Sequence, residues 1–231
     1  MKGSTLEPKA AIWDLDGVIA DTAELHFKAW RRLAGELGRT LTYEEFLPTF
    51  GRRNAEIASK LLPPTLTPDQ VAKLTERKER YFREQIGPDF QAAPGVVKLV
   101  QQLHEHGYRQ AIASSAPLAN VKLILSRLHL TQCFSAVVSG EDATLGKPHP
   151  QVFLLAARRL RVSPSRSVVF EDSVAGVEAA RAAGMAVIAI ANSWPREALQ
   201  EADIIVASLE EVTVSTLDSL IDRPPHTEVS R

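Results

Sequence analysis

Residues 10–17 read Ala10-Ala11-Ile12-Trp13-Asp14-Leu15-Asp16-Gly17, an apolar run that ends in two aspartates and a glycine. The apolar part predicts a short buried strand over Ala10–Leu15, and the glycine permits a sharp turn after it. Because side chains alternate along a strand, Asp14 and Asp16 point to the same side and can share one site. Two such carboxylates suit a nucleophile paired with an acid/base, or a shared cation. An Asp-Gly turn without function is the alternative interpretation.

The stretch after this strand shows helical periodicity and no convincing strand until about Gly87. Asp21 with Glu24 three residues later indicates a helix start, apolar residues then recur at helical spacing, and Gly38 can end the helix. Three more helical segments are expected over Tyr43–Thr49, Asn54–Leu62 and Pro68–Gln85.

Short apolar runs alternate with helical patterns from Gly87-Pro88 onward, which indicates parallel βαβ units. The expected strands are Gln110–Ala113, Ala136–Ser139, Val168–Phe170, Ala186–Ala191 and Ile204–Val206. The expected helices are Gly95–His106, Pro117–Leu128, Pro150–Arg159, Val174–Ala183, Arg196–Glu201 and Val214–Ile221. Gly107 and Gly184 fall where helix ends belong. The sequence therefore predicts an α/β fold with a doubly wound, Rossmann-like, mostly parallel sheet, interrupted by an all-helical insertion.

This pattern divides the chain into a core and a cap. We expect residues 1–20 and 88–222 to form an α/β catalytic core and residues 21–87 a helical cap. The tail, residues 223–231, contains Pro224-Pro225 among polar neighbours and is expected to be disordered. In doubly wound sheets, ligands bind at the carboxyl ends of the strands.

Composition excludes several classes of function. The 231 residues are 45% hydrophobic and 24% charged with a formal net charge of -1, so no basic surface favours nucleic acid. Cys133 is the only cysteine, which rules out an internal disulfide and favours a reducing compartment. No secretion signal is recognisable, and the longest apolar stretch, Met185–Ala191, falls far short of the ~20 residues that cross a bilayer. We expect a soluble, cytoplasmic monomer with no membrane partner.

Further polar residues follow the other predicted strands. Glu171-Asp172 follows Val168–Phe170, and hard oxygen ligands at several strand ends suit Mg²⁺. Lys147 precedes a helix and could neutralise a phosphate, or it could be an ordinary exposed loop lysine. Ser114 and Ser115 follow another strand and could bind an anion or cap the next helix. Asp172 or Ser173 could likewise be only a helix cap.

Competing motifs are absent from the sequence. Gly140 and Gly146 have five residues between them and Pro148 stands at the Ser/Thr position, so this loop is not a P-loop. There is no Gly-x-Ser-x-Gly elbow for a serine nucleophile and no Gly-x-Gly-x-x-Gly for a dinucleotide.

Four segments together closely resemble the motifs of the haloacid dehalogenase superfamily. They are Asp14-Leu15-Asp16-Gly17-Val18-Ile19-Ala20-Asp21-Thr22, Ser114-Ser115, Gly146-Lys147-Pro148-His149-Pro150 and Glu171-Asp172-Ser173-Val174-Ala175-Gly176. They span nearly the whole chain, and the helical insertion resembles the cap of the β-phosphoglucomutase and phosphoglycolate phosphatase subgroup.

The resemblance implies a phosphotransfer mechanism for a small phosphorylated substrate. Asp14 attacks phosphorus and forms an aspartyl-phosphate, while Asp16 protonates the leaving oxygen and later deprotonates the acceptor. Ser114 and Lys147 hold the phosphoryl group. The implied Mg²⁺ ligands are Asp14, Glu171, Asp172 and the main-chain carbonyl of Asp16. Other expected substrate contacts are Gly17, Thr22, His26, Arg52, Arg53, Arg83 and Ser115.

The predicted cap departs from the mutase pattern. The mutases have a lysine where Phe50 stands and an arginine where Asn54 stands, and Ser115-Ala116-Pro117 lacks the lysine that follows their serine motif. His26 and Trp30 resemble the mutase cap helix, but at i and i+4 they could also be a packing pair. The cap arginines could equally be solvated surface. These departures favour a phosphatase of a small metabolite, such as a sugar phosphate, with a hexose-phosphate mutase or a non-catalytic phospholigand-binding regulator as alternatives.

Overall fold

The computed structural model describes residues 7–222 of the chain. The tail that was expected to be disordered, residues 223–231, lies outside the described residues. In the described part, no helix is both long enough and apolar enough to cross a membrane.

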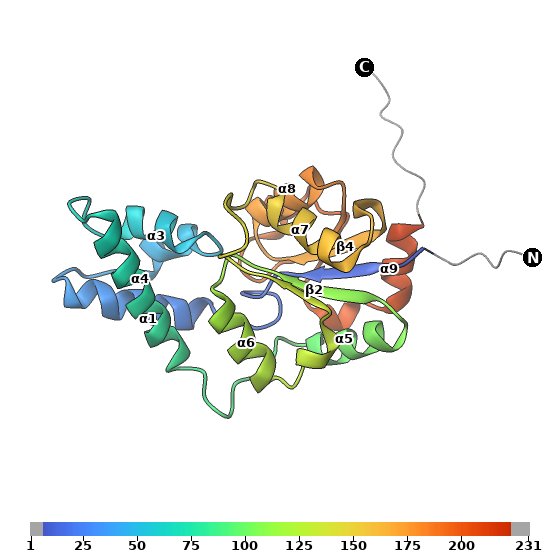
Figure 1. The fold of residues 1–231 in the computed structure, drawn as a ribbon, viewed down its shortest axis with the longest axis horizontal. Helices are drawn as coiled ribbons and strands as arrows, with labels where there is room; N and C mark the ends of the chain where they lie inside the picture. Colours follow the sequence, from blue (N-terminus) through green and yellow to red (C-terminus); the bar gives the residue numbers. More distant parts are fainter. Residues whose placement is uncertain (1–6, 223–231) are drawn as a thin grey trace, which may run out of the picture.

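One parallel sheet of six strands forms the centre of the molecule (Figure 1). The strands are β1 (Ala10–Trp13), β2 (Arg109–Ala113), β3 (Ala136–Val138), β4 (Ser167–Glu171), β5 (Ala186–Ile190) and β6 (Ile204–Val206). Their order is β3-β2-β1-β4-β5-β6, and every neighbouring pair is parallel. The predicted doubly wound sheet is therefore confirmed, with β1 between β2 and β4.

Side chains of β1 alternate between two hydrophobic layers, as the period of a strand requires. Ala11 and Trp13 pack into the layer under α5 (Val96–Glu105), α6 (Leu118–Arg127) and α9 (Val214–Ile221). Ala10 and Ile12 pack into the opposite layer, under α7 (Gln151–Leu160) and α8 (Val174–Ala182). Because both faces of the sheet are covered, β1 reads as a continuous apolar run rather than an alternating one.

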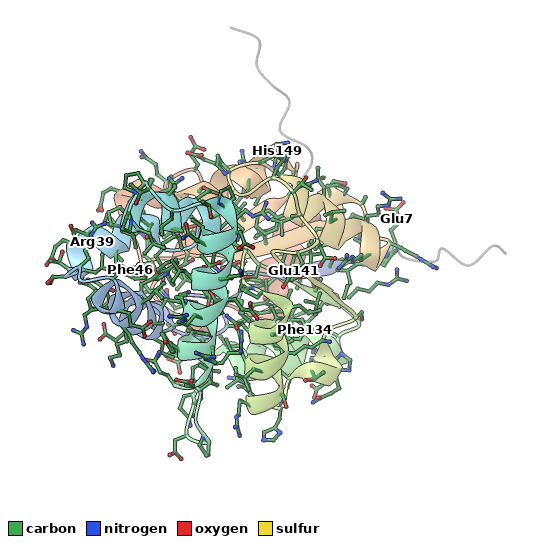
Figure 2. The ribbon with its side chains drawn as sticks, turned by 60° about the vertical axis from the view of Figure 1, so that its left-hand side comes forward. Glu7, Arg39, Phe46, Phe134, Glu141 and His149 are labelled. Carbon is green, nitrogen blue, oxygen red and sulfur yellow. The ribbon has the colours of Figure 1, made fainter. Side chains whose placement is uncertain are left out.

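Between β1 and α5 the described chain forms helices only. These are α1 (Ala23–Glu36), α2 (Tyr43–Phe46), η1 (Leu47–Thr49), α3 (Asn54–Leu61) and α4 (Pro68–Arg83). They share a hydrophobic core of their own, which includes Trp30, Phe46 and Leu61. In Figure 2, Arg39 and Phe46 mark this helical block, on the side of the molecule away from Glu7, which precedes β1. The block therefore lies at the carboxyl ends of the strands.

Two local predictions were wrong, and a third segment changes its helix type. Tyr43–Thr49 is helical as predicted, but Pro48 has no N–H to continue the α-helical pattern and α2 is followed directly by the 3₁₀ helix η1. Arg196–Glu201 forms only the short 3₁₀ turn η4 (Arg196–Leu199), in which Leu199 alone is buried. The first cap helix is not capped by Asp21, since its N-cap residue is Thr22 and makes no side-chain cap bond.

Candidate active site

Three carboxylates meet at the carboxyl ends of β1 and β4. One carboxylate oxygen from each of Asp14, Glu171 and Asp172 lies within 4.8 Å of the others, and all three residues are buried. The strand pairing explains this meeting, because Trp13 is in register with Phe170 and the Asp14 amide donates to the Phe170 carbonyl at 3.0 Å. The predicted convergence of the two acidic motifs is confirmed in this geometry.

Lys147 lies against this cluster rather than on the surface. Its Nζ donates to Asp14 Oδ1 at 2.7 Å and also to Glu171 Oε1, and the residue is buried. Burial alone would lower the pKa of Lys147, but the charges of Asp14 and Glu171 outweigh it and raise that pKa. The alternative of an exposed loop lysine is wrong.

Glu171 is held by its own strand-to-helix turn. Its Oε2 accepts from the amides of Asp172 and Ser173 at 2.8 and 2.9 Å and from Ser173 Oγ at 3.0 Å. Ser173 Oγ also accepts from the Gly176 amide at 3.1 Å, so Ser173 caps α8 as one reading of the sequence suggested. A Cβ at Gly176 would lie 1.9 Å from Glu171 Cδ, so only glycine leaves room for this carboxylate.

Two residues that follow β5, Asn192 and Ser193, were not predicted to belong to the site. Ser193 Oγ donates to Asp172 Oδ2, and Asn192 Nδ2 donates to the Gly17 carbonyl at 2.6 Å. A signal was present, because these residues also follow a strand and reach the same edge of the sheet. They fix both Asp172 and the turn after Asp16.

The charge of the cluster matches a divalent cation. Asp14, Glu171 and Asp172 face one lysine, so two negative charges are left uncompensated in a buried place. Burial, with the charges of Glu171 and Asp16, raises the pKa of Asp14 to about 7 despite Lys147. Burial and the charges of Glu171 and Asp14 likewise raise the pKa of Asp172. Clustered hard oxygen donors with excess negative charge are what Mg²⁺ requires, so the residues present fit the ion.

Asp16 is bound on the cap side instead. Its Oδ1 accepts from Thr22 Oγ1 at 2.6 Å and lies 3.2 Å from His26 Nε2. Burial raises the pKa of Asp16, but His26, Thr22 and Lys78 outweigh burial and lower it below its ordinary value. Thr22 does not cap α1 because its hydroxyl is used here.

Behind His26 runs a buried polar chain that the sequence did not reveal. Lys78 Nζ lies 2.6 Å from His26 Nδ1 and donates to Glu79 Oε1 at 2.7 Å. Both Lys78 and Glu79 are buried. They stand in the run Glu76-Arg77-Lys78-Glu79-Arg80, which reads as a solvated helix face, and no local signal separates them from their exposed neighbours. His26 also stacks on Phe82, with 3.9 Å between the ring centroids, so its ring packs in the cap while its nitrogens contact Asp16 and Lys78.

A narrow cavity joins the two halves of the site. Residues of the core and of the cap line it: Asp14, Asp16, His26, Trp30, Phe50, Gly51, Arg52, Asn54, Ile57, Lys78, Glu79, Ser114, Ser115, Ala116 and Pro117. Its volume is about 30 Å³, so the cap and the core leave little space between them.

The chain matches the family of haloacid dehalogenase-like hydrolases over residues 11–190. It belongs to this family. Among curated relatives, a phosphorylated carbohydrates phosphatase of Thermotoga maritima is 34% identical over 77% of this chain and 82% of its own length. A β-phosphoglucomutase of Bacillus subtilis is 32% identical over 90% of this chain and 93% of its own. The solved structure of a β-phosphoglucomutase from Clostridium difficile has a TM-score of 0.84 at 25% identity and covers 93% of this chain and 97% of that one.

The expected site residues that line this cavity are Asp14, Asp16, His26, Arg52, Ser114 and Ser115. The three cap arginines differ in their places. Arg52 lines the cavity and pairs with Glu56 at 3.6 Å. Arg53 lines a smaller neighbouring cavity with Lys147 and donates to the carbonyls of Gly140 and Thr144, which ties cap to core. Arg83 lines neither cavity and donates to Asn120 Oδ1 at 3.0 Å.

Ser114, Gly17 and Thr22 contribute in different ways. Ser114 is buried, and its Oγ accepts from the Ala116 amide at 3.1 Å, which shapes the turn that faces Asp14. Gly17 adopts a left-handed φ of 83°, and a Cβ there would lie 1.9 Å from Asp172 Oδ2. Gly17 and Thr22 support the carboxylates and do not line the cavity.

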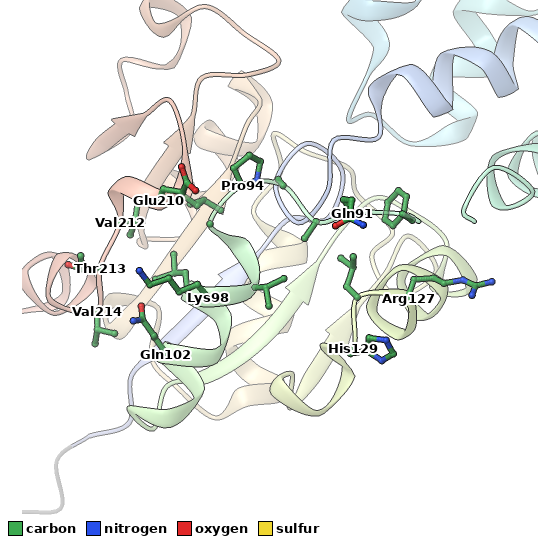
Figure 3. A pocket seen from close by; sticks show the side chains of 18 of the residues that line it. Gln91, Pro94, Lys98, Gln102, Arg127, His129, Glu210, Val212, Thr213 and Val214 are labelled. Carbon is green, nitrogen blue, oxygen red and sulfur yellow. The ribbon is translucent and has the colours of Figure 1, made fainter. Parts of the chain in front are cut away.

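A much larger hollow lies elsewhere on this haloacid dehalogenase-like hydrolase (Figure 3). Its volume is about 990 Å³, and it lies beside α5 and α9 with Lys98, Arg127, His129 and Glu210 among its lining residues. None of the three clustered carboxylates lines it. Size therefore does not mark the candidate active site, which the cap covers.

Proposed function

We propose that this protein is a Mg²⁺-dependent phosphatase that hydrolyses a small phosphorylated metabolite through an aspartyl-phosphate on Asp14. The observation that supports this most is the meeting of Asp14, Glu171 and Asp172 within 4.8 Å beside Lys147, with Asp16 on the same cavity. A phosphorylated carbohydrates phosphatase among the relatives favours a sugar phosphate as the substrate.

The core residues would receive the phosphoryl group. Asp14 attacks phosphorus, and Lys147 and Ser114 neutralise or donate to the phosphoryl oxygens as negative charge shifts between them. Glu171, Asp172, Asp14 and the main-chain carbonyl of Asp16 would hold Mg²⁺. When bound, the ion screens the charge between the anionic carboxylate and the anionic ester.

Asp16 would serve as the acid and then the base. Its lowered pKa favours the ionised form, which the second step needs to take a proton from water. For the first step it must donate a proton to the leaving oxygen, and an arriving phosphate dianion raises a neighbouring carboxyl's pKa by like-charge repulsion. Thr22 and His26 hold the carboxylate in place for both steps.

The second candidate function is a β-phosphoglucomutase-type reaction, favoured by the Bacillus subtilis relative that matches nearly full length. A mutase must bind both phosphate groups of a bisphosphate intermediate. Phe50, Asn54 and the segment Ser115-Ala116-Pro117 line the cavity but lack the lysines and the arginine of the mutase pattern, which favours hydrolysis.

The test is release of inorganic phosphate from a broad panel of phosphate esters by wild type and Asp14→Asn. We expect turnover that needs Mg²⁺ and is lost in Asp14→Asn, whereas Asp89→Asn, which changes an exposed carboxylate, retains it. Retained turnover in Asp14→Asn would exclude Asp14 as the nucleophile. Conversion of β-glucose 1-phosphate to glucose 6-phosphate after priming with a bisphosphate would show that the protein is a mutase and not a phosphatase. No turnover of any ester would favour a phospholigand-binding regulator.

A further inference from the structure

Besides its basic side chains, the cap contributes three residues with polar groups to the cavity that the phosphoryl chemistry does not use: Trp30, Asn54 and Glu79. We call them the cap wall. Asp16, which would protonate the leaving oxygen, lines the same cavity. The alcohol that leaves must therefore lie between Asp16 and the cap wall, so the chemistry of the cap wall bears on which alcohol fits. This reasoning rests on the proposed phosphatase function.

Glu79 is an ionised acceptor with spare capacity. Burial raises its pKa, but the Lys78 charge, with His26 and Asn120, outweighs burial and holds that pKa at about 2. Its Oε1 accepts from Lys78 and from Asn54 Nδ2 at 2.8 Å, and its Oε2 accepts from Asn120 Nδ2. Because a carboxylate has about four acceptor sites, one remains on Oε2 for an O–H donor.

Trp30 offers the complementary group. Its side chain is fully buried, and its Nε1–H has no acceptor among the described residues. A buried N–H without an acceptor is unfavourable, so an acceptor that reaches it from the cavity is favoured. Asn54 keeps its amide oxygen and one N–H, because Glu79 uses only one of its hydrogens. The cap wall therefore offers both donors and acceptors, and the hydroxyl groups of a polyol can use both.

The cavity offers no unpaired cation for a second phosphate. Two basic side chains other than His26 line it, Lys78 and Arg52. Lys78 is paired with Glu79 at 2.7 Å, and Arg52 with Glu56 at 3.6 Å. A second phosphate would also face the Glu79 carboxylate, and like charges in a buried place repel strongly.

We propose that Trp30, Asn54 and Glu79 form hydrogen bonds with the hydroxyl groups of the leaving alcohol. The enzyme therefore selects polyhydroxylated monophosphates and rejects bisphosphates and apolar esters. Trp30 and Glu79 are specificity-determining residues in this reading, with the indole N–H donating to one hydroxyl oxygen and Glu79 Oε2 accepting from a hydroxyl hydrogen.

The experiment compares kcat/KM for the best of a panel of hexose, pentose and polyol monophosphates with that for phenyl phosphate, which has no hydroxyl group. Glu79→Gln should lower the ratio of the two values by about 10- to 100-fold, because a hydrogen bond to a charged acceptor is lost. Trp30→Phe keeps a ring but removes the N–H, and should lower the same ratio by about 5-fold. Wild type should prefer fructose 6-phosphate over fructose 1,6-bisphosphate by at least about 10-fold.

Asn120→Ala is the matched control for a structural effect. It removes the core partner of Glu79 Oε2 without changing a residue that lines the cavity. If Glu79 only held the cap to the core, Glu79→Gln and Asn120→Ala would each lower kcat/KM for the sugar phosphate and for phenyl phosphate by the same factor. Equal losses, an unchanged ratio in Trp30→Phe, or a wild-type preference for phenyl phosphate would overturn the hydroxyl-reading proposal while leaving the phosphatase intact. Absence of Mg²⁺-dependent turnover of any ester by wild type would overturn both.

Discussion

A single methyl group added at Gly176 should disable the carboxylate cluster. A Cβ there would lie 1.9 Å from both Cδ and Oε1 of Glu171, whereas non-bonded heavy atoms approach to about 3.5 Å. Glu171 must therefore move by more than about 1 Å. It is fully buried and held by Lys147 and by three donors of its own turn, so it cannot move without breaking those bonds.

The energies can be compared directly. Overpacking costs about 1–3 kcal/mol, and alanine returns about 1 kcal/mol as the better helix former. Gly176→Ala should therefore destabilise the fold by up to about 2 kcal/mol, a fall in Tm of up to roughly 8 °C for a chain of this size. A metal ligand displaced by about 1 Å should lower kcat/KM by about 100-fold and Mg²⁺ affinity by about 10- to 100-fold.

Gly35→Ala provides the matched control. Gly35 also lies within a helix, α1, and a Cβ there would meet nothing within 4 Å. This variant should keep its activity and gain up to about 1 kcal/mol. Thermal unfolding, Mg²⁺ titration by calorimetry and phosphate release would be measured for both. Wild-type Mg²⁺ affinity in Gly176→Ala would refute the assignment of Glu171 to the metal site.

Two further predictions concern buried charges. Lys147→Met leaves the carboxylates without their lysine partner, which should destabilise the fold by about 3 kcal/mol and lower kcat at least about 100-fold. Lys98→Met, at an exposed position, is the control. If both variants had the same effects on urea unfolding and phosphate release, the role of Lys147 in the site would be contradicted. Glu79 has a pKa of about 2 when folded against 4.5 ordinarily, so its stabilisation is complete above pH 4.5 and is lost as the pH falls toward 2. Wild type should be more stable than Glu79→Gln by at most about 3 kcal/mol, because burial lowers the pKa of Lys78 even beside Glu79. This difference in the free energy of unfolding should shrink as the pH falls from 4.5 toward 2. A difference in urea unfolding that stays constant over this range would contradict the prediction.

The core of the site could be predicted because its signals are local. Asp14 and Ser114 each follow a strand and Glu171 ends one, and parallel strands bring their carboxyl ends to one edge whatever their order. Lys147 was identified from its motif, although its burial was not evident from a loop sequence. Asn192 and Ser193 also follow a strand, but they belong to none of the four motifs that the resemblance supplied.

The two buried charges of α4 could not be predicted, for a different reason. Lys78 and Glu79 are buried by contacts that α4 makes with α1 and α6, and the charged sequence around them is that of an exposed helix. Local sequence rules also failed where a tertiary contact uses a side chain that could cap a helix. Thr22 is the N-cap residue of α1, but its hydroxyl donates to Asp16 Oδ1 and not to the cap.

The central place of β1 has a consequence for how the chain matures. Ala10 pairs with Arg109 on one side and with Ser167 on the other, so the strand that carries Asp14 is made first and acquires its neighbours late. The helical block after it draws its hydrophobic core from one contiguous stretch, residues 23–74, so this core can form before the later strands have been made. During synthesis Asp14 therefore lacks its neighbours Glu171 and Asp172 until β4 has left the ribosome.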